Sequence, residues 1–170
     1  MHVQNWLRAL LFHTCLFVTI LVAGCARPTS ATALNSLRNE LWTGRISLNV
    51  KSEPEQSFSA GFELKGQSER GELTLISPLG NVLGVLRWAP GKAELDSGNR
   101  NIQRFDSVDA LMLQATGAAV PLTALFAWLQ GDNATASGWS ADLSRQGEGR
   151  INATRMQPLP QADLRVVLDR

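Results

Sequence analysis

LTLISPLGNVLGVLRW, from Leu73 to Trp88, is the stretch that decides the fold of this chain. Two apolar runs, residues 71–76 and 82–88, flank the turn Ser77-Pro78-Leu79-Gly80. A connection this short requires the two strands to be antiparallel neighbours. The turn is unusual, because turns favour Gly, Pro, Asn, Asp and Ser, and a Leu gains nothing from exposure to water. The stretch therefore predicts an antiparallel sheet and raises the question of what Leu79 does.

The first 24 residues have the features of a targeting segment. His2 and Arg8 precede an apolar run over residues 9–23, which is too short to span a bilayer comfortably as a helix. The run ends in Leu21-Val22-Ala23-Gly24-Cys25, which resembles the lipobox of bacterial lipoproteins, whose Cys sulfur carries the lipid. We expect residues 1–24 to be a lipoprotein signal peptide and Cys25 to be lipidated. The alternative is an ordinary secretory signal with an incidental Cys.

Residues 25–33 are rich in Pro, Ser and Thr, which predicts a lipidated tether between the anchor and the folded domain. Ala26 and Arg27 follow the Cys, so the Asp that typically retains lipoproteins in the inner membrane is missing. By resemblance to that sorting rule, we expect the protein at the outer membrane. It would lie on the periplasmic face, lipid-anchored through its N-terminal Cys.

Removal of the first 24 residues leaves few kinds of side chain that could act in catalysis. His2, His13 and Cys15 lie in that segment, Cys25 would be blocked by lipid, and the chain has no Tyr. A His-based triad, a Cys nucleophile and a Cys/His zinc site are therefore impossible in the mature chain. With no paired-carboxylate motif and no Gly-rich phosphate loop, we expect no enzyme, no cofactor and no metal. A carboxylate-dependent hydrolase stays open as the enzymatic alternative.

The numbers of basic and acidic residues argue against a nucleic-acid partner. Removing Arg8 from the 16 Lys and Arg leaves 15, which equals the 15 Asp and Glu. No basic stripe is present in the sequence, so we expect no nucleic-acid partner.

The remaining residues, 34–170, suit a single domain with one core. Alternation of apolar and polar residues predicts strands over residues 45–50, 57–65, 71–76, 82–88, 93–96, 139–145, 150–155 and 162–168. Helical spacing predicts a short helix over 34–41 and longer ones over 107–115 and 121–131. Asp106 or Ser107 would cap the second helix, and the third has Pro at its start and Gly at its end. Together these segments predict one curved antiparallel sheet with two or three helices.

Large aromatic side chains come from both the strands and the helices: Trp42, Phe58, Phe62, Trp88, Phe126 and Trp128. They can fill a core completely or line an apolar cavity, and the sequence does not distinguish the two.

Several short motifs then occur in one order: the lipobox, Leu41-Trp42-Thr43-Gly44-Arg45-Ile46, Ser57-Phe58-Ser59-Ala60-Gly61-Phe62, Ser77-Pro78-Leu79-Gly80, Val120-Pro121-Leu122 and Leu125-Phe126-Ala127-Trp128-Leu129-Gln130-Gly131. In this order the chain resembles the LolB family, outer-membrane receptors that accept lipoproteins from the periplasmic carrier LolA. The resemblance implies a mainly β fold, an unclosed and strongly curved antiparallel β-barrel (a half-barrel) covered by two or three α-helices. It also implies a hydrophobic cavity for acyl chains.

The resemblance implies three partners: the carrier LolA, acylated lipoprotein cargo and outer-membrane lipids. We expect the protein to be a monomer. The residues expected to line the cavity are Phe58, Phe62, Leu64, Trp88, Leu125, Phe126 and Trp128. The alternative function is a lipid-anchored structural or assembly factor of the outer membrane, whose sheet covers a solid core.

In LolB-like proteins the Leu of the Pro-Leu-Gly turn protrudes and is needed to pass cargo lipids into the membrane. Carried to this chain, the membrane-insertion tip is Leu79, and Pro78 and Gly80 form the tip turn. The alternative is that Leu79 folds back under a neighbouring strand. Two departures from the family concern the size and rim of the cavity. Residues 141–160 leave space for fewer strands than usual, and Glu63-Leu64 replace a common aromatic.

Overall fold

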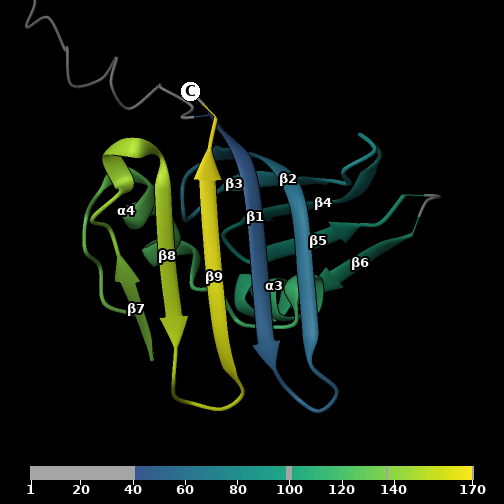
Figure 1. Cartoon of the computed structure of the whole chain (residues 1–170). Coiled ribbons are helices and arrows are strands. Elements are labelled where there is room, and N and C mark those ends of the chain that lie inside the picture. Colours follow the sequence, from purple (N-terminus) through teal and green to yellow (C-terminus); the bar gives the residue numbers. More distant parts are fainter. Residues whose placement is uncertain (1–40, 99–100, 137, 170) are drawn as a thin grey trace, which may run out of the picture. The chain divides into compact units, whose positions relative to one another are not determined.

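The computed structural model describes residues 41–98, 101–136 and 138–169, all of which fall in the unit Asn39–Arg170. Their strands form a single antiparallel sheet in the order β6-β5-β4-β3-β2-β1-β9-β8-β7 (Figure 1). The strands are β1 (Leu41–Lys51), β2 (Gln56–Gly66), β3 (Gly71–Ile76), β4 (Val82–Ala89), β5 (Lys92–Asp96), β6 (Ile102–Phe105), β7 (Trp139–Asp142), β8 (Arg150–Arg155) and β9 (Gln161–Leu168). The two edge strands, β6 and β7, do not pair with each other, so the barrel is unclosed as expected.

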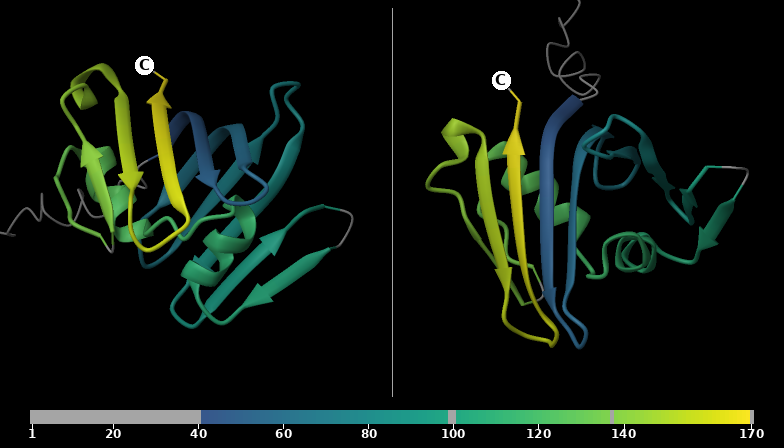
Figure 2. Two further views of the ribbon diagram at one scale, coloured as in Figure 1. Left: turned by 60° about the horizontal axis from the view of Figure 1, so that its bottom comes forward. Right: turned by 45° about the vertical axis from the view of Figure 1, so that its right-hand side comes forward.

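The sheet curves strongly, and both described helices lie on its inner side. Strands β4, β5 and β6 run at a large angle to β1, β9 and β8 in Figure 1, and the further views in Figure 2 show the same bend. The helices are α3 (Val108–Thr116) and α4 (Leu122–Gln130). The expected half-barrel with helices against one face is therefore confirmed.

Alternation along the strands decides which face of the sheet is covered. In β9, Leu164 and Val166 are fully buried, whereas Arg165 and Val167 between and beyond them are exposed. Most apolar strand residues point inward with a period of two, because successive side chains point to opposite faces. The core is thus a single cluster between the inner face of the sheet and the two helices.

The helix boundaries follow the expected capping residues. Ser107 is the N-cap of α3, and its Oγ accepts a hydrogen bond from the Ala110 backbone N–H at 3.1 Å. Gly117 closes α3, whereas α4 lies between Pro121 and Gly131. Ser and Thr oxygens satisfy free N–H groups at a helix start, and Gly accepts the left-handed conformation at its end. Both predicted helices are confirmed.

Three details of the sequence prediction are corrected. Leu41 belongs to β1, so the helix expected over 34–41 does not reach it, and the rest of that segment lies outside the described residues. Strand β7 ends at Asp142 rather than at residue 145, because a 3-10 helix (Gln146–Glu148) leads into β8. Strand β6 has no strict alternation in its sequence, and it forms because it pairs with β5.

The expected signal peptide, the lipidated residue Cys25 and the tether over residues 25–33 lie outside the described residues.

Candidate functional site

The turn between β3 and β4 holds Leu79 at its tip. The Gly80 N–H donates to the Ser77 carbonyl at 2.9 Å, and the Ser77 N–H donates to the Asn81 carbonyl at 2.8 Å. Ser77 Oγ accepts a further hydrogen bond from the Asn81 N–H at 3.1 Å. Gly80 has φ of 83°, a left-handed conformation that a residue with a Cβ adopts only at a cost. The backbone of the turn is therefore closed by its own hydrogen bonds.

Leu79 is 88% exposed, so its side chain does not fold back under a neighbouring strand. Two more apolar residues beside the turn are exposed as well, Val82 at 60% and Leu83 at 46%. The pairing of β3 with β4 shifts register between Leu75 and Ile76, which lets the start of β4 leave the regular alternation. We call Leu79, Val82 and Leu83 the apolar tip.

The residues expected to line a cavity lie on the inner face of the sheet and on α4. Phe58 is half-buried, and the others are buried in the core cluster, with exposed fractions of 6% or less: Phe62, Leu64, Trp88, Leu125, Phe126 and Trp128. Sheet and helix meet where the rings of Trp88 and Phe126 make an edge contact, with centroids 6.4 Å apart. The structure therefore brings these residues together in one apolar layer, which α3 and α4 cover.

Two surface pockets border this layer. One of about 300 Å³ contains Trp88 and Val108, beside the turn from β4 to β5. Another of about 500 Å³ contains Phe58 and Leu113, between the start of β2 and the end of α3. Both bring solvent to the margin of the apolar layer on the α3 side.

Trp42 places a polar group, its indole N–H, on the inner face of the sheet. The sequence did not single out this residue as part of a site. It pairs with Leu64 in the sheet and packs against the core cluster. Its indole Nε1 is buried and, within the described residues, has no hydrogen-bond partner. By contrast, Nε1 of Trp128 donates to the Ala134 carbonyl at 2.9 Å. A buried donor without a partner is costly, which makes Trp42 a candidate to receive an acceptor from a ligand.

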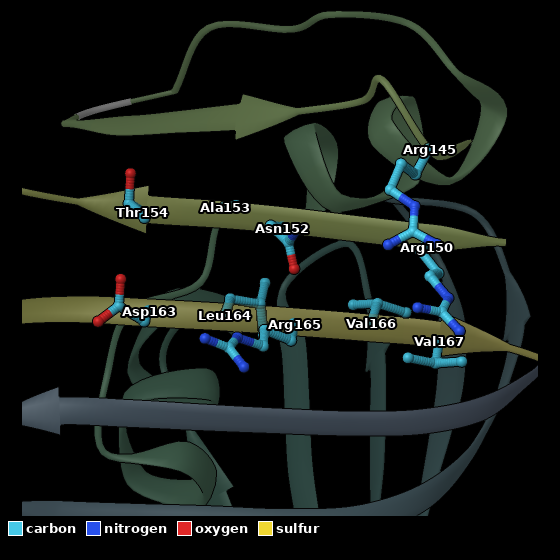
Figure 3. A pocket seen from close by; sticks show the side chains of 10 residues that line it. All are labelled: Arg145, Arg150, Asn152, Ala153, Thr154, Asp163, Leu164, Arg165, Val166 and Val167. Atoms are coloured by element: carbon cyan, nitrogen blue, oxygen red, sulfur yellow. The ribbon is translucent and has the colours of Figure 1, made fainter. Parts of the chain in front are cut away.

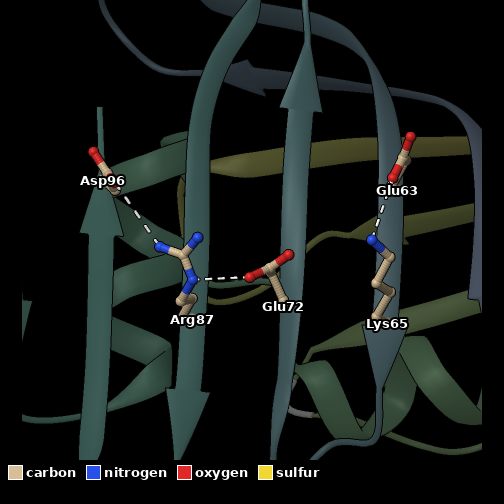
Figure 4. Close-up of polar contacts among 5 residues, drawn as sticks. All are labelled: Glu63, Lys65, Glu72, Arg87 and Asp96. Atoms are coloured by element: carbon tan, nitrogen blue, oxygen red, sulfur yellow. Dashed lines mark hydrogen bonds and ion pairs between the residues drawn. The ribbon is translucent and has the colours of Figure 1, made fainter. Parts of the chain in front are cut away.

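The outer face of the sheet carries ordinary surface ion pairs on strands β2 to β5 (Figure 4). Arg87 Nε lies 2.8 Å from Glu72 Oε2, and its second contact to Asp96 is 3.9 Å. Exposed pairs of this kind contribute at most about 1 kcal/mol each to stability. They do not mark a reaction centre.

Sequence reasoning located the Leu79 turn and the apolar inner face but missed the polar and flanking parts of the site. The sequence pattern predicts Val82 and Leu83 as buried strand residues, but the register shifts beside them and both are exposed. The free Nε1 of Trp42 depends on which carbonyl groups the fold brings near it, and no sequence pattern carries that information.

None of the helices in the described part of the chain has the length and hydrophobicity needed to cross a bilayer.

Comparison with known proteins gives a consistent result. A family model described as Outer membrane lipoprotein LolB matches residues 41–159, from the start of β1 to the loop before β9. A protein of Cupriavidus metallidurans named Outer-membrane lipoprotein LolB is 31% identical over 145 residues, which cover 83% of this chain and 70% of that protein. One of the same name from Bordetella petrii is 30% identical over 180 residues, covering 92% and 87%. Another from Chromobacterium violaceum is 30% identical over 121 residues, covering 68% and 65%.

Proposed function

Because this chain belongs to the LolB family of outer-membrane lipoproteins, we propose that it accepts acylated lipoproteins from the periplasmic carrier LolA and inserts them into the outer membrane. The family is one of lipoprotein localisation, and its location is the outer membrane. The proposal for this chain adds the donor, the direction of transfer and the residues that act. Lipid attachment at Cys25 belongs to the same proposal.

The single observation that carries the proposal is the apolar tip. A Leu that is 88% exposed on a turn closed by its own hydrogen bonds gains nothing in water. At a membrane the same side chain enters the boundary between headgroups and acyl chains, which contributes about 2 kcal/mol. That is too little to anchor the protein, so the tip orients the domain and disturbs the bilayer where cargo is delivered.

The apolar layer beneath α3 and α4 is the proposed binding site for acyl chains. Phe62 and Leu64 supply the floor from β2, and Phe126 on α4 supplies part of the cover. Because these residues are buried against each other, an acyl chain enters only if a helix moves away from the sheet. The pocket that contains Phe58 and Leu113 is the proposed point of entry, since it lies where α3 meets β2.

Transfer then needs no nucleotide. An acyl chain gains roughly 0.8 kcal/mol for each CH₂ that leaves water. Cargo therefore moves downhill if the receptor buries more of the chain than the carrier does and the bilayer buries all of it. In this scheme the Nε1 of Trp42 donates to a carbonyl oxygen of the acyl linkage.

The test is a transfer assay in two steps. Carrier loaded with a radiolabelled lipoprotein is mixed first with the soluble receptor and then with liposomes. We expect label to move from carrier to receptor and from receptor to liposome without ATP. Label that stays on the carrier at every receptor concentration would overturn the proposal.

A second function, a lipid-anchored assembly factor, is favoured by one observation. Six of the seven expected lining residues are buried in a filled core, as a solid structural domain requires. Depletion of the protein in cells distinguishes the two. Loss of a receptor strands many unrelated lipoproteins on the carrier, whereas loss of an assembly factor disturbs one complex.

A further inference from the structure

The two helices are held against the sheet in different ways. Helix α4 has polar and aromatic contacts with its neighbours. Gln146 Nε2, from the 3-10 helix, donates to a carbonyl in the last turn of α4 at 2.8 Å. The ring of Trp128 lies 6.4 Å from that of Trp139 on β7, and the ring of Phe126 contacts that of Trp88 on β4. These interactions join α4 to two strands on opposite sides of the sheet.

Helix α3 lies against β5 and β6 and has no comparable contact. Among the residues that the structure describes, no side-chain hydrogen bond, ion pair or ring contact joins α3 to a strand. Helix α3 buries three residues, Leu111, Met112 and Thr116, whereas α4 buries six. Elements with few buried contacts open locally at a lower free energy. We therefore expect α3 to leave the sheet more readily than α4.

The link between the two helices is fixed to the sheet. Trp139 Nε1, on β7, donates to the Ala119 carbonyl at 3.1 Å, and Ala118 and Val120 on either side of that residue are buried. Gly117, at the end of α3, has φ of 78°, a left-handed conformation that glycine adopts without steric cost. A rotation of α3 about Gly117 therefore leaves the link and α4 in place.

Both pockets that border the apolar layer lie at the ends of α3. The pocket of about 500 Å³ contains the last turn of α3 and Phe58, and we call it the α3-end pocket. The pocket of about 300 Å³ contains Ser107, Val108 and Trp88, and we call it the α3-start pocket. The nine residues of α3 form a helix about 14 Å long. A chain that runs beneath α3 connects the two pockets.

The pocket over β8 and β9 has a different lining (Figure 3). It measures about 520 Å³, and Arg150, Asp163 and Arg165 are among the residues that line it. An apolar chain placed there would remove water from charged groups, which is costly. This pocket therefore does not suit an acyl chain.

We propose that an acyl chain of the cargo lies beneath α3, from the α3-end pocket to the α3-start pocket, and that α3 alone lifts to admit it. Helix α4 then acts as a fixed wall. The inference rests on the proposed function, which makes the apolar layer an acyl site. Leu111 and Met112 leave the sheet with α3 and then cover the chain, and the unbranched Met side chain adapts to an irregular surface. The site favours chains long enough to reach both pockets.

The experiment places a polarity-sensitive bimane label at one cysteine. The protein is the chain without residues 1–24 and with Cys25→Ala, which contains no other cysteine. Leu113→Cys carries the label at the α3-end pocket, and Lys92→Cys carries it at the α3-start pocket. The matched control is Thr123→Cys, an exposed position on α4. The ligands are one peptide with an octanoyl chain and the same peptide with a hexadecanoyl chain, and equilibrium dialysis measures the binding of each.

The two peptides are compared at concentrations that give equal occupancy in dialysis. We expect the hexadecanoyl peptide to shift the emission of the label at both pockets and the octanoyl peptide to shift it only at Leu113→Cys, because the shorter chain does not pass the length of α3. The label at Thr123→Cys should not respond to either peptide. In hydrogen exchange without ligand, the amides of α3 should exchange about tenfold faster than those of α4, and bound hexadecanoyl peptide should slow them.

The outcomes separate this inference from the proposed function. Binding in dialysis without any response at Lys92→Cys would overturn the path beneath α3 and leave the proposed function standing. Equal exchange of the two helices, or an equal response at Thr123→Cys, would overturn the assignment of α3 as the moving helix. No binding of either peptide would overturn both. If Leu113→Cys lowers the melting temperature, Gln114→Cys, which is exposed in the same pocket, takes its place.

Discussion

At the scale of one residue, Leu79 shows that the contribution of an apolar side chain to stability depends on its position. In the core such a residue stabilises the fold, but at 88% exposure it contributes almost nothing to stability. We therefore predict that Leu79→Glu changes the free energy of unfolding by less than about 0.5 kcal/mol. Uptake of lipoprotein from the carrier should persist, whereas release to liposomes should fail because a carboxylate resists entering the bilayer. Melting temperature and the two transfer steps are measured separately.

The matched control for this substitution is Leu159→Glu. Leu159 is 69% exposed in the loop between β8 and β9, and strands β1 and β2 separate that pair of strands from the β3–β4 pair that carries the tip. Release to liposomes should be normal in this variant. If both variants fail alike, the effect is one of charge in general and the tip has no special role.

Trp42 offers a second test at a single residue. Its Nε1 is buried without a partner in the described chain, so Trp42→Phe removes a desolvated donor as well as some packing. These effects oppose each other, and we predict a change in unfolding free energy within about 1 kcal/mol. Affinity for an acylated peptide should fall about fivefold, the value of one hydrogen bond. Denaturant unfolding and fluorescence titration measure the two quantities.

Trp128→Phe is the comparison for Trp42. It removes a donor that is used, since Nε1 of Trp128 bonds the Ala134 carbonyl at 2.9 Å. We expect this variant to lose about 1–3 kcal/mol of unfolding free energy, because a carbonyl is left unpaired. Equal acyl affinity of the Trp42 variant and the unaltered protein would rule out the proposed role of that indole.

At the scale of an element, α4 acts as the cover of the apolar layer. Phe126 is 6% exposed on α4, and its ring contacts Trp88 across the core. We predict that Phe126→Ala lowers the free energy of unfolding by about 3–5 kcal/mol, because it removes buried surface and leaves a cavity. Binding of an apolar fluorescent probe should rise, since the space created lies in the proposed acyl site. Urea unfolding and probe titration test both effects.

Leu113→Ala on the other helix provides the contrast. Leu113 is 52% exposed on α3, so its truncation should cost less than about 1 kcal/mol. A similarly small loss for Phe126→Ala would mean that α4 does not cover the sheet as described. Unchanged probe binding in a destabilised Phe126 variant would favour the solid-core function.

For the whole molecule, attachment and folding are expected to be independent. The nine strands and both helices described lie within Leu41–Leu168, and Cys25 precedes all of them. We predict that Cys25→Ala, provided the signal is still cleaved, yields a soluble and folded periplasmic protein, since acyl chains are then absent. Cell fractionation after a wash with high salt and circular dichroism measure the two properties. A cleaved variant that remains in the membrane would show that the anchor lies elsewhere.

Much of this architecture can be predicted from short segments of the sequence. Alternation in residues such as Leu164, Arg165 and Val166 predicts a strand with one covered face, and Ser107 and Gly131 mark helix ends, because these effects act over a few neighbouring residues. The turn of Pro78, Leu79 and Gly80 can likewise be predicted from neighbouring residues alone. The short β6 was missed because its pairing with β5 is not a local property.

The sequence pattern by itself determined that this is one curved antiparallel sheet with helices, and it singled out Leu79 at a turn; that the sheet is an unclosed half-barrel covered by the helices was implied by the resemblance to the LolB family. Only the tertiary structure decided that Leu79 stands free in solvent, that Val82 joins it, and that the indole of Trp42 has no partner among the described residues. These properties depend on strand register, which is set by the packing of residues far apart in the chain and so leaves no pattern in any one segment.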